Sequence, residues 1–372
     1  MSKYYEYILS TFLIAILFSS HAVFAKEGTG IMINDGKYSW QMKDSEKHIW
    51  LHQDATNEDL KAISHIEDVT SIGIRGIMSG AAGPFITDEG LSHIRNMKQL
   101  KSLDLSFLNI TNHGLQYISE LEKLQILRLN ATKVTDDGLR YLSHLQNLQE
   151  LWLDGLPITD TGVVYLKNMT KLKVLRFYNA SITDKGMENF QNMLELKDLQ
   201  LGRALITDKS MPIIGKMTKL ETLDLRTKIT DDGLTYLSNL SELKWLALSD
   251  TAIGDAGINH ITKLHNLKWL YLEGTKVTDT GIKKMTNLPK LSTLYLSRTS
   301  ITDKSLESIA KLTNLESLKL NETQITDIGL KKLHSLKQLK QLELHKTKTS
   351  SKGIDDLRIE IPELGIITHK NY

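Results

Sequence analysis

Residues Leu124–Asn147 read LQILRLNATKVTDDGLRYLSHLQN, and this 24-residue unit decides the fold. Leu127 and Leu129 are two residues apart, so they point to the same side of a strand, and the residue between them points to the other side. Thr135 and Asp136 follow a turn. Both are residue types that cap helix N-termini, because their side-chain oxygens accept hydrogen bonds from free backbone amides. The leucines after them mark the buried side of a short helix or 3₁₀ turn.

Copies of this unit recur, mostly every 24 residues, from about Glu46 to Pro362, which makes about thirteen repeats. A single copy cannot bury its own leucines, so neighbouring copies must stack into one solenoid. We therefore expect function on a surface and not in a pocket. The clear copies begin at Leu100, Leu124, Leu148, Leu172, Leu196, Leu220, Leu243, Leu267, Leu291, Leu315 and Leu339, and the Leu220 copy is one residue short.

The pattern LxxLxLxxT…ITDxGLxxLxxL resembles the leucine-rich repeat family, in a form most similar to its bacterial and F-box-associated subclass. The resemblance implies an α/β solenoid: an arc with a parallel β-sheet on the concave face and short helices or 3₁₀ turns on the convex face. One departure is a Thr where family members often have Asn or Cys after the strand. A Thr hydroxyl can still bond to the turn backbone. These threonines are Thr132, Thr251, Thr275, Thr299, Thr323 and Thr347.

Residues 1–25 are interpreted as a secretory signal peptide, with Lys3 before an apolar stretch at Ile8–Phe18 and a cleavage site after Ala25. The alternative is an uncleaved membrane anchor, but a membrane span needs about 20 apolar residues. After cleavage we expect no stable membrane insertion. A secreted chain without cysteine points to a bacterium and not an animal, so the predicted location is secreted or periplasmic.

The two ends of the repeat domain, residues 46–362, need caps. Ile31–Trp40 alternates around an Asn34–Gly36 turn, which predicts that residues 26–45 form an N-terminal β-hairpin cap with Trp40 as its core anchor. The Val69 copy carries an insertion at Gly76–Pro84. It is compatible with a flap over the concave face and with a tolerated excursion of the chain.

The last copy loses the ITD turn at Thr349–Ser351. Beyond it, Ile359–Thr368 is predicted as a cap strand, and residues 363–372 as the C-terminal cap.

Several function classes lack support in the sequence. The net charge is +2 and no basic tract is present, so nucleic acid is a poor candidate partner. The chain has no cysteine nucleophile, no GxSxG and no phosphate loop, so we expect no enzyme and no cofactor. His48 and His52 flank Trp50 on a predicted strand, but a metal site needs a third ligand and none is evident.

Candidate binding residues are those predicted to point outward from the concave sheet. Trp245 and Trp269 hold the same position in consecutive copies, as do Tyr271 and Tyr295, and strands about 4.8 Å apart would stack each pair. We expect these four rings to form one exposed patch. They could simply reinforce neighbouring strands, but Trp, Tyr and Arg lead the residues of binding hot spots. Three charged residues are expected near the patch edge: Arg226, Glu273 and Arg298.

A second, more polar zone is predicted further N-terminal. Asp104 and Arg128 occupy matching positions in neighbouring strands and could simply pair. The zone is therefore compatible with binding and with reinforcement of the sheet alike. Its members are Asp104, Arg128, Glu150, Trp152, Asp154, Arg176, Tyr178 and Asp198.

The leading hypothesis is a secreted or periplasmic bacterial leucine-rich repeat protein that binds a protein partner through its concave sheet. The first alternative is binding of carbohydrate or cell wall through the same rings. A second alternative rests on the resemblance alone, since substrate adaptors of ubiquitin ligases carry similar ITDxGL repeats. Against it, the segment before the repeats is too short for an F-box. The sequence does not define an oligomeric state.

Overall fold

The computed structural model describes residues 31–33, 38–43, 46–52, 54–74 and 85–368. Three predicted features lie outside the described residues: the signal peptide at 1–25, the hairpin turn at Asn34–Gly36 and the insertion at Gly76–Pro84. Among the helices that are described, none has the length and apolar character needed to cross a bilayer.

Most repeats contribute a strand of three residues, centred on the first Leu of the LxL pair. The strands are β1 Ile31–Ile33, β2 Tyr38–Lys43, β3 Glu46–Leu51, β4 Val69–Ile74, β5 Ser102–Asp104, β6 Ile126–Arg128, β7 Glu150–Trp152, β8 Val174–Arg176, β9 Asp198–Gln200, β10 Thr222–Asp224, β11 Trp245–Ala247, β12 Trp269–Tyr271, β13 Thr293–Tyr295, β14 Ser317–Lys319, β15 Gln341–Glu343 and β16 Gly365–Ile367.

After each strand from β3 to β15 the chain crosses to the outer side and forms a short helix. The α-helices are α2 Asn57–Ile63, α3 Asp88–Ile94, α4 Asn112–Ile118, α5 Asp136–Leu139, α6 Asp160–Val163, α7 Asp184–Met187, α8 Met211–Ile214, α9 Asp255–Ile261, α10 Asp279–Ile282, α11 Asp303–Ile309, α12 Asp327–Leu330 and α13 Ser351–Glu360. The 3₁₀ helices are η1 Arg140–Leu142, η2 Val164–Leu166, η3 Glu188–Phe190, η4 Asp208–Ser210, η5 Gly233–Asn239, η6 Met285–Asn287 and η7 Lys331–Ser335.

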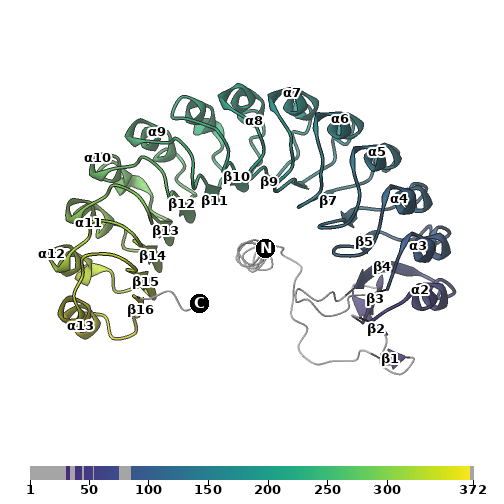
Figure 1. Cartoon of the computed structure of the whole chain (residues 1–372), viewed down its shortest axis with the longest axis horizontal. Coiled ribbons are helices and arrows are strands. Elements are labelled where there is room, and N and C mark those ends of the chain that lie inside the picture. Colours follow the sequence, from purple (N-terminus) through teal and green to yellow (C-terminus); the bar gives the residue numbers. More distant parts are fainter. Residues whose placement is uncertain (1–30, 34–37, 44–45, 53, 75–84, 369–372) are drawn as a thin grey trace.

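The described strands form one 16-stranded sheet in chain order, from β1 to β16. From β3 onward every neighbouring pair is parallel, and equivalent leucines face each other, as Leu127 faces Leu151. At the N-terminal edge β1 pairs with β2, and β2 with β3, both antiparallel. The side chain of Trp40 lies outside the described part. Figure 1 shows the sheet along the inside of an arc and the helices along its outside. The predicted α/β solenoid is confirmed.

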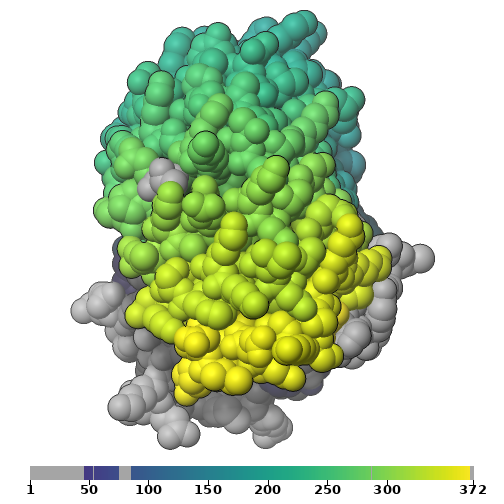
Figure 2. All heavy atoms as spheres, turned by 90° about the vertical axis from the view of Figure 1, so that its left-hand side faces the viewer, coloured from purple at the N-terminus to yellow at the C-terminus, as the bar shows by residue number. Residues whose placement is uncertain are grey.

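The leucines of successive repeats form one continuous core. In the Leu124 copy the side chains of Leu124, Leu127, Leu129, Leu139 and Leu142 are fully buried, and every described repeat supplies its equivalents. Burying one such side chain contributes roughly 1.5–3 kcal/mol. Figure 2 shows the C-terminal repeats, in yellow and green, packed directly against one another. Each repeat therefore provides the apolar surface against which the next repeat packs.

The Asp of the ITD turn ties most repeats to the next, while Asn57 and Asn112 take its place at two junctions and Asp231 bonds only the amide of Gly254. Asp160 Oδ1 accepts a hydrogen bond from the Thr183 amide at 2.8 Å, and its Oδ2 accepts one from the Thr183 hydroxyl at 2.5 Å. Thr183 is the N-cap residue of α7. Asp160 therefore does for the next helix what an N3 Glu does within a capping box. We call these contacts the Asp–Thr ladder. It comprises Asp88–Thr111, Asp136–Thr159, Asp160–Thr183, Asp184–Thr207, Asp208–Thr230, Asp255–Thr278, Asp279–Thr302, Asp303–Thr326 and Asp327–Ser350.

The ladder corrects the sequence interpretation of the turn. Thr caps its own helix, as predicted: the Thr159 side chain accepts from the amide of Thr161. Asp does not cap its own helix but the next one. The position of this carboxylate also explains the glycine of ITDxG. A Cβ atom on Gly186 would lie 2.3 Å from Asp160 Oδ1, which is too close for any other residue type unless the carboxylate shifts. Where Ser210 replaces this glycine, its hydroxyl donates to Asp184 instead.

The first repeat has no preceding Asp, and its sequence compensates. Position N3 of α2 holds Asp59 in place of the usual glycine, and its Oδ2 accepts from both the amide and the hydroxyl of Thr56, at 2.8 and 2.9 Å. The carboxylate that other repeats receive from their neighbour thus comes from within the same helix.

The threonines after the strands bond within their own turns. The Thr251 hydroxyl donates to the Leu248 carbonyl at 2.6 Å, and Thr132 and Thr323 make the same contact to the residue three positions earlier. The predicted bond to the turn backbone is confirmed. It closes the turn after each strand and does not link repeats.

The C-terminal prediction was wrong in part. Ser350 takes the place of the ladder threonine, and its two hydrogen bonds lower the pKa of Asp327, because both donors favour the ionised carboxylate. Ser350 also caps α13, so helix continues to Glu360. Ile359 and Glu360 therefore end a helix, and only Gly365–Ile367 form a strand.

We expect Asp160→Ala to lower the urea midpoint of unfolding. The substitution leaves the Thr183 amide and hydroxyl without their acceptor, which costs roughly 1–3 kcal/mol. Asp137→Ala is the matched control, because Asp137 is an exposed Asp in the first turn of a neighbouring helix. Equal midpoints for the two variants would show that the ladder does not stabilise the arc.

Candidate functional site on the concave face

The middle residue between the two leucines of LxL points out of the sheet at the centre of the concave face. In chain order from the Leu100 copy this central column is Asp104, Arg128, Trp152, Arg176, Gln200, Asp224, Ala247, Tyr271, Tyr295, Lys319 and Glu343. Strand pairing places consecutive members directly beside one another. The column therefore brings charged and aromatic residues together that are 24 residues apart in sequence.

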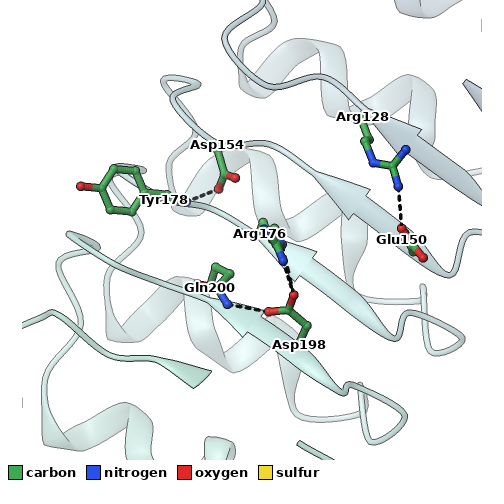
Figure 3. A network of polar contacts seen from close by, with 7 residues as sticks. All are labelled: Arg128, Glu150, Asp154, Arg176, Tyr178, Asp198 and Gln200. Atoms are coloured by element: carbon green, nitrogen blue, oxygen red, sulfur yellow. Dashed lines mark hydrogen bonds and ion pairs between the residues drawn. The ribbon is translucent and has the colours of Figure 1, made fainter. Parts of the chain in front are cut away.

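Ion pairs between neighbouring strands hold the polar zone. Arg176 donates through Nε and Nη2 to Asp198 Oδ2, at 3.2 and 2.5 Å, and Gln200 donates to the other oxygen of Asp198. Arg128 donates to Glu150 at 3.2 Å (Figure 3). These contacts fix long side chains that would otherwise sample many rotamers.

Trp152 lies between two guanidinium groups. The Arg128 guanidinium carbon is 4.6 Å from the centre of the indole ring, and that of Arg176 is 4.1 Å from it. Each is a cation–π contact. Trp152 is only 7% exposed. The predicted pairing of Asp104 with Arg128 is present but long, at 3.9 Å.

Asp224 is the most deeply buried carboxyl group of the zone. Its side chain is fully buried, and the Arg226 guanidinium donates to both of its oxygens. Burial raises the pKa of Asp224 to about 8 and lowers that of Arg226 to about 10. Arg226 was predicted at the edge of the aromatic patch. Its guanidinium lies 5.3 Å from the centre of the Tyr178 ring in the polar zone, and its charge also lies near Tyr271 of the aromatic patch.

Asp154 sits under the same network. Its Oδ1 accepts from the backbone amide of Tyr178 at 2.8 Å. Burial raises the pKa of Asp154 to about 6, although the nearby Arg176 charge opposes the shift. For Arg176 itself burial lowers the pKa, but the carboxylates of Asp198 and Asp154 outweigh this effect and raise it. The zone is thus a set of buried and half-buried polar groups that bond one another.

The aromatic patch differs from the prediction in two ways. Trp245 and Tyr271 are 6% and 8% exposed, so half of the patch is buried and only Trp269 and Tyr295 are partly accessible. The tyrosine pair also does not stack face to face. Tyr271 and Tyr295 meet edge to face at 89° with centroids 4.8 Å apart, and Trp245 lies tilted against Tyr271 at 5.3 Å. Offset and edge geometries are favoured electrostatically over a parallel sandwich.

Charged residues surround the aromatic patch. Lys319 Nζ lies 4.3 Å from the Tyr295 ring centre and forms an ion pair with Glu343 at 3.0 Å. Arg298 bonds Asp250 two repeats away at 2.8 Å. Burial raises the pKa of Glu273, against the attraction of Lys319 and Arg298.

The sequence analysis missed four polar members of this surface: Gln200, Asp224, Lys319 and Glu343. All four stand in the central column, so the 24-residue period alone would have found them. No described group of three or more His, Cys, Asp or Glu residues is arranged to hold a metal ion.

Comparisons with known proteins agree with this architecture. A profile described as "Leucine-rich repeat region" matches residues 229–364. An internalin of Listeria monocytogenes is similar in structure, with a TM-score of 0.62 and 21% identity, over 85% of this chain and 95% of that one. A leucine-rich repeat protein of Leptospira interrogans aligns with a TM-score of 0.57 and 19% identity, over 82% and 80% of the two chains. No curated protein sequence matches significantly.

The repeat pattern, the parallel concave sheet and these likenesses together define the class. The chain has the leucine-rich repeat fold, and residues 229–364 match the leucine-rich repeat profile.

We expect Asp224→Asn to flatten the dependence of stability on pH. The raised folded pKa means that the folded state binds the additional proton, so the free energy of unfolding falls as pH rises from about 4 to about 8. The free energy of unfolding is measured in urea at about pH 5 and at about pH 8. Between these two pH values the free energy of unfolding of the wild type should fall by roughly 1–3 kcal/mol more than that of the variant. Asp137→Asn, at an exposed site, should behave as wild type. A variant with the wild-type slope would contradict this assignment.

Proposed function

We propose that this chain is a secreted or periplasmic bacterial leucine-rich repeat protein that binds a protein partner through its concave face. The observation that carries the proposal is the fixed cluster of Arg, Trp and Tyr side chains from β6 to β13. These residue types dominate binding hot spots. Because ion pairs and ring contacts already hold them, a partner would lose little side-chain entropy on binding them.

The geometry of the rings favours a protein partner over a carbohydrate. A sugar stacks on a free ring face, but the Trp152 ring has an arginine about 4–5 Å from its centre on either neighbouring strand. The Tyr295 ring is approached by Lys319 and by Tyr271. Partly accessible edges and nearby charges suit a polar protein surface better.

The partner assay compares two double variants of the chain that begins at Lys26. The concave variant is Trp269→Ala with Tyr295→Ala, two partly accessible rings. The convex control is Tyr165→Ala with Tyr236→Ala, which are exposed on the outer side. The comparison requires that the three proteins have equal melting temperatures. We expect the wild type and the convex control to capture the same envelope protein. That protein should bind the concave variant at least about tenfold more weakly.

Two results would change the proposal. Equal capture by all three proteins would remove the concave rings from the binding site. Retention of the wild type on peptidoglycan or envelope polysaccharide, lost only in the concave variant, would replace the protein partner by a carbohydrate.

The compartment is tested separately by expressing the full chain with its own N-terminus in a bacterium. We expect the exported protein to begin at Lys26 when its N-terminal sequence is determined, because Val23-Phe24-Ala25 fits a signal-peptidase site. Retention in the cytosol with Met1 in place would contradict secretion.

A further inference from the structure

The fold gathers lysines on one broad side of the arc. Because the strands from β3 onward are parallel, the segments that enter them all lie on the same side, and the segments that leave them lie on the other. In the eleven clear repeats we define the strand-entry rim as residues 95–101, 119–125, 143–149, 167–173, 191–197, 215–221, 238–244, 262–268, 286–292, 310–316 and 334–340. Contacts between neighbouring repeats, such as Lys171 to Asn147 at 2.8 Å, show that these segments lie side by side.

Charge is distributed unequally between the two rims. On the strand-entry rim 17 Lys and Arg residues stand against 6 Asp and Glu residues. The opposite, strand-exit rim holds 11 basic and 13 acidic residues. The strand-exit rim comprises residues 107–113, 131–137, 155–161, 179–185, 203–209, 227–232, 250–256, 274–280, 298–304, 322–328 and 346–352. A chain with a net charge of only +2 therefore presents one strongly basic side.

The acids of the strand-entry rim do not cancel this excess. Several already form ion pairs with single lysines, as Glu195 does with Lys219 at 2.6 Å and Glu316 with Lys340 at 2.7 Å. Nine other lysines of this rim are exposed and form no ion pair within 4.0 Å with a described residue: Lys123, Lys167, Lys171, Lys173, Lys216, Lys263, Lys268, Lys290 and Lys311. They are spread along the arc, and six of them stand in two local groups, Lys167, Lys171 and Lys173 in one and Lys263, Lys268 and Lys290 in the other.

The composition of the rim indicates the kind of partner. Sixteen of its 17 basic residues are Lys, which acts as a hydrated point charge, and only Arg95 offers a planar fork for bidentate recognition. The rim contains no Phe, Tyr or Trp on which bases of a single-stranded nucleic acid could stack. The charge is spread from one end of the arc to the other, so it suits an extended anionic surface and not a compact ligand.

We propose that the strand-entry rim docks the protein on the surface of an anionic lipid bilayer. Lysines near such a surface are attracted individually, and their contributions accumulate without a defined binding geometry. In this orientation the plane of the arc lies along the membrane and the concave face stays open to the side. The inference does not depend on the proposed function, because the two surfaces share none of the residues to be substituted.

The test is flotation of the full chain with vesicles of phosphatidylcholine alone, or of phosphatidylcholine mixed with phosphatidylglycerol. The rim variant replaces Lys167, Lys171, Lys173, Lys263, Lys268 and Lys290 by Gln. The matched control replaces six exposed lysines of the strand-exit rim by Gln: Lys133, Lys185, Lys209, Lys228, Lys276 and Lys304. Both variants lose the same formal charge, so only the location of the charge differs.

We expect binding only to vesicles with phosphatidylglycerol. The rim variant should bind about tenfold more weakly or worse, and the control close to wild type. About 1 M salt, where the Debye length is roughly 3 Å, should release the wild type. Binding that persists in this salt and in both variants would reflect insertion of the apolar stretch Ile8–Phe18 and overturn the proposal.

Two further results would also overturn it. An equal loss of vesicle binding in both variants would show that the net charge of the protein, and not the position of its lysines, determines binding. Binding of the wild type to soluble polyphosphate but not to phosphatidylglycerol vesicles would assign the rim to a polymeric anion instead of a bilayer.

Discussion

The Asp–Thr ladder is the constraint on which the regularity of this solenoid depends. Leucine packing provides most of the burial, but it is non-directional and would tolerate small shifts of one repeat against the next. The ladder is directional, because one carboxylate accepts both from the amide and from the hydroxyl of the next N-cap residue. It thereby fixes the helix start, and with it the register, of each following repeat. The glycine of ITDxG and the exceptional Asp59 of the first repeat both follow from where this carboxylate must lie.

The same stacking that builds the core also sorts polar side chains into columns. Side chains at the same position of consecutive repeats lie beside each other on neighbouring strands. A favourable contact between two such side chains therefore stabilises the pairing of those strands. On the concave face this produces alternating carboxylates and guanidinium groups around Trp152, and then four aromatic rings. Arg226 joins the two zones, since it contacts Asp224 and Tyr178 and carries a charge near Glu273 and Tyr271. The candidate site is therefore one continuous surface and not two.

The buried charges on the concave face do not necessarily stabilise the fold. Replacing an internal ion pair by apolar groups is often neutral or stabilising. Fixed charges and rings do, however, present a pre-organised surface to a partner. The lysines of the strand-entry rim differ in kind, because they are exposed and contribute to the electric field of one side of the arc without fixing the fold.

The sequence by itself determined the repeat, the strand and helix of each unit, the buried leucines and the direction in which each concave residue points. These properties depend on the period of two along a strand and the period of 24 along the chain, both of which are local. Only the tertiary structure decided that Trp245 and Tyr271 are buried, that Asp136 caps the neighbouring helix, and that lysines far apart in sequence share one rim. Burial and electrostatic field depend on side chains of adjacent repeats, and no window of a single repeat contains them.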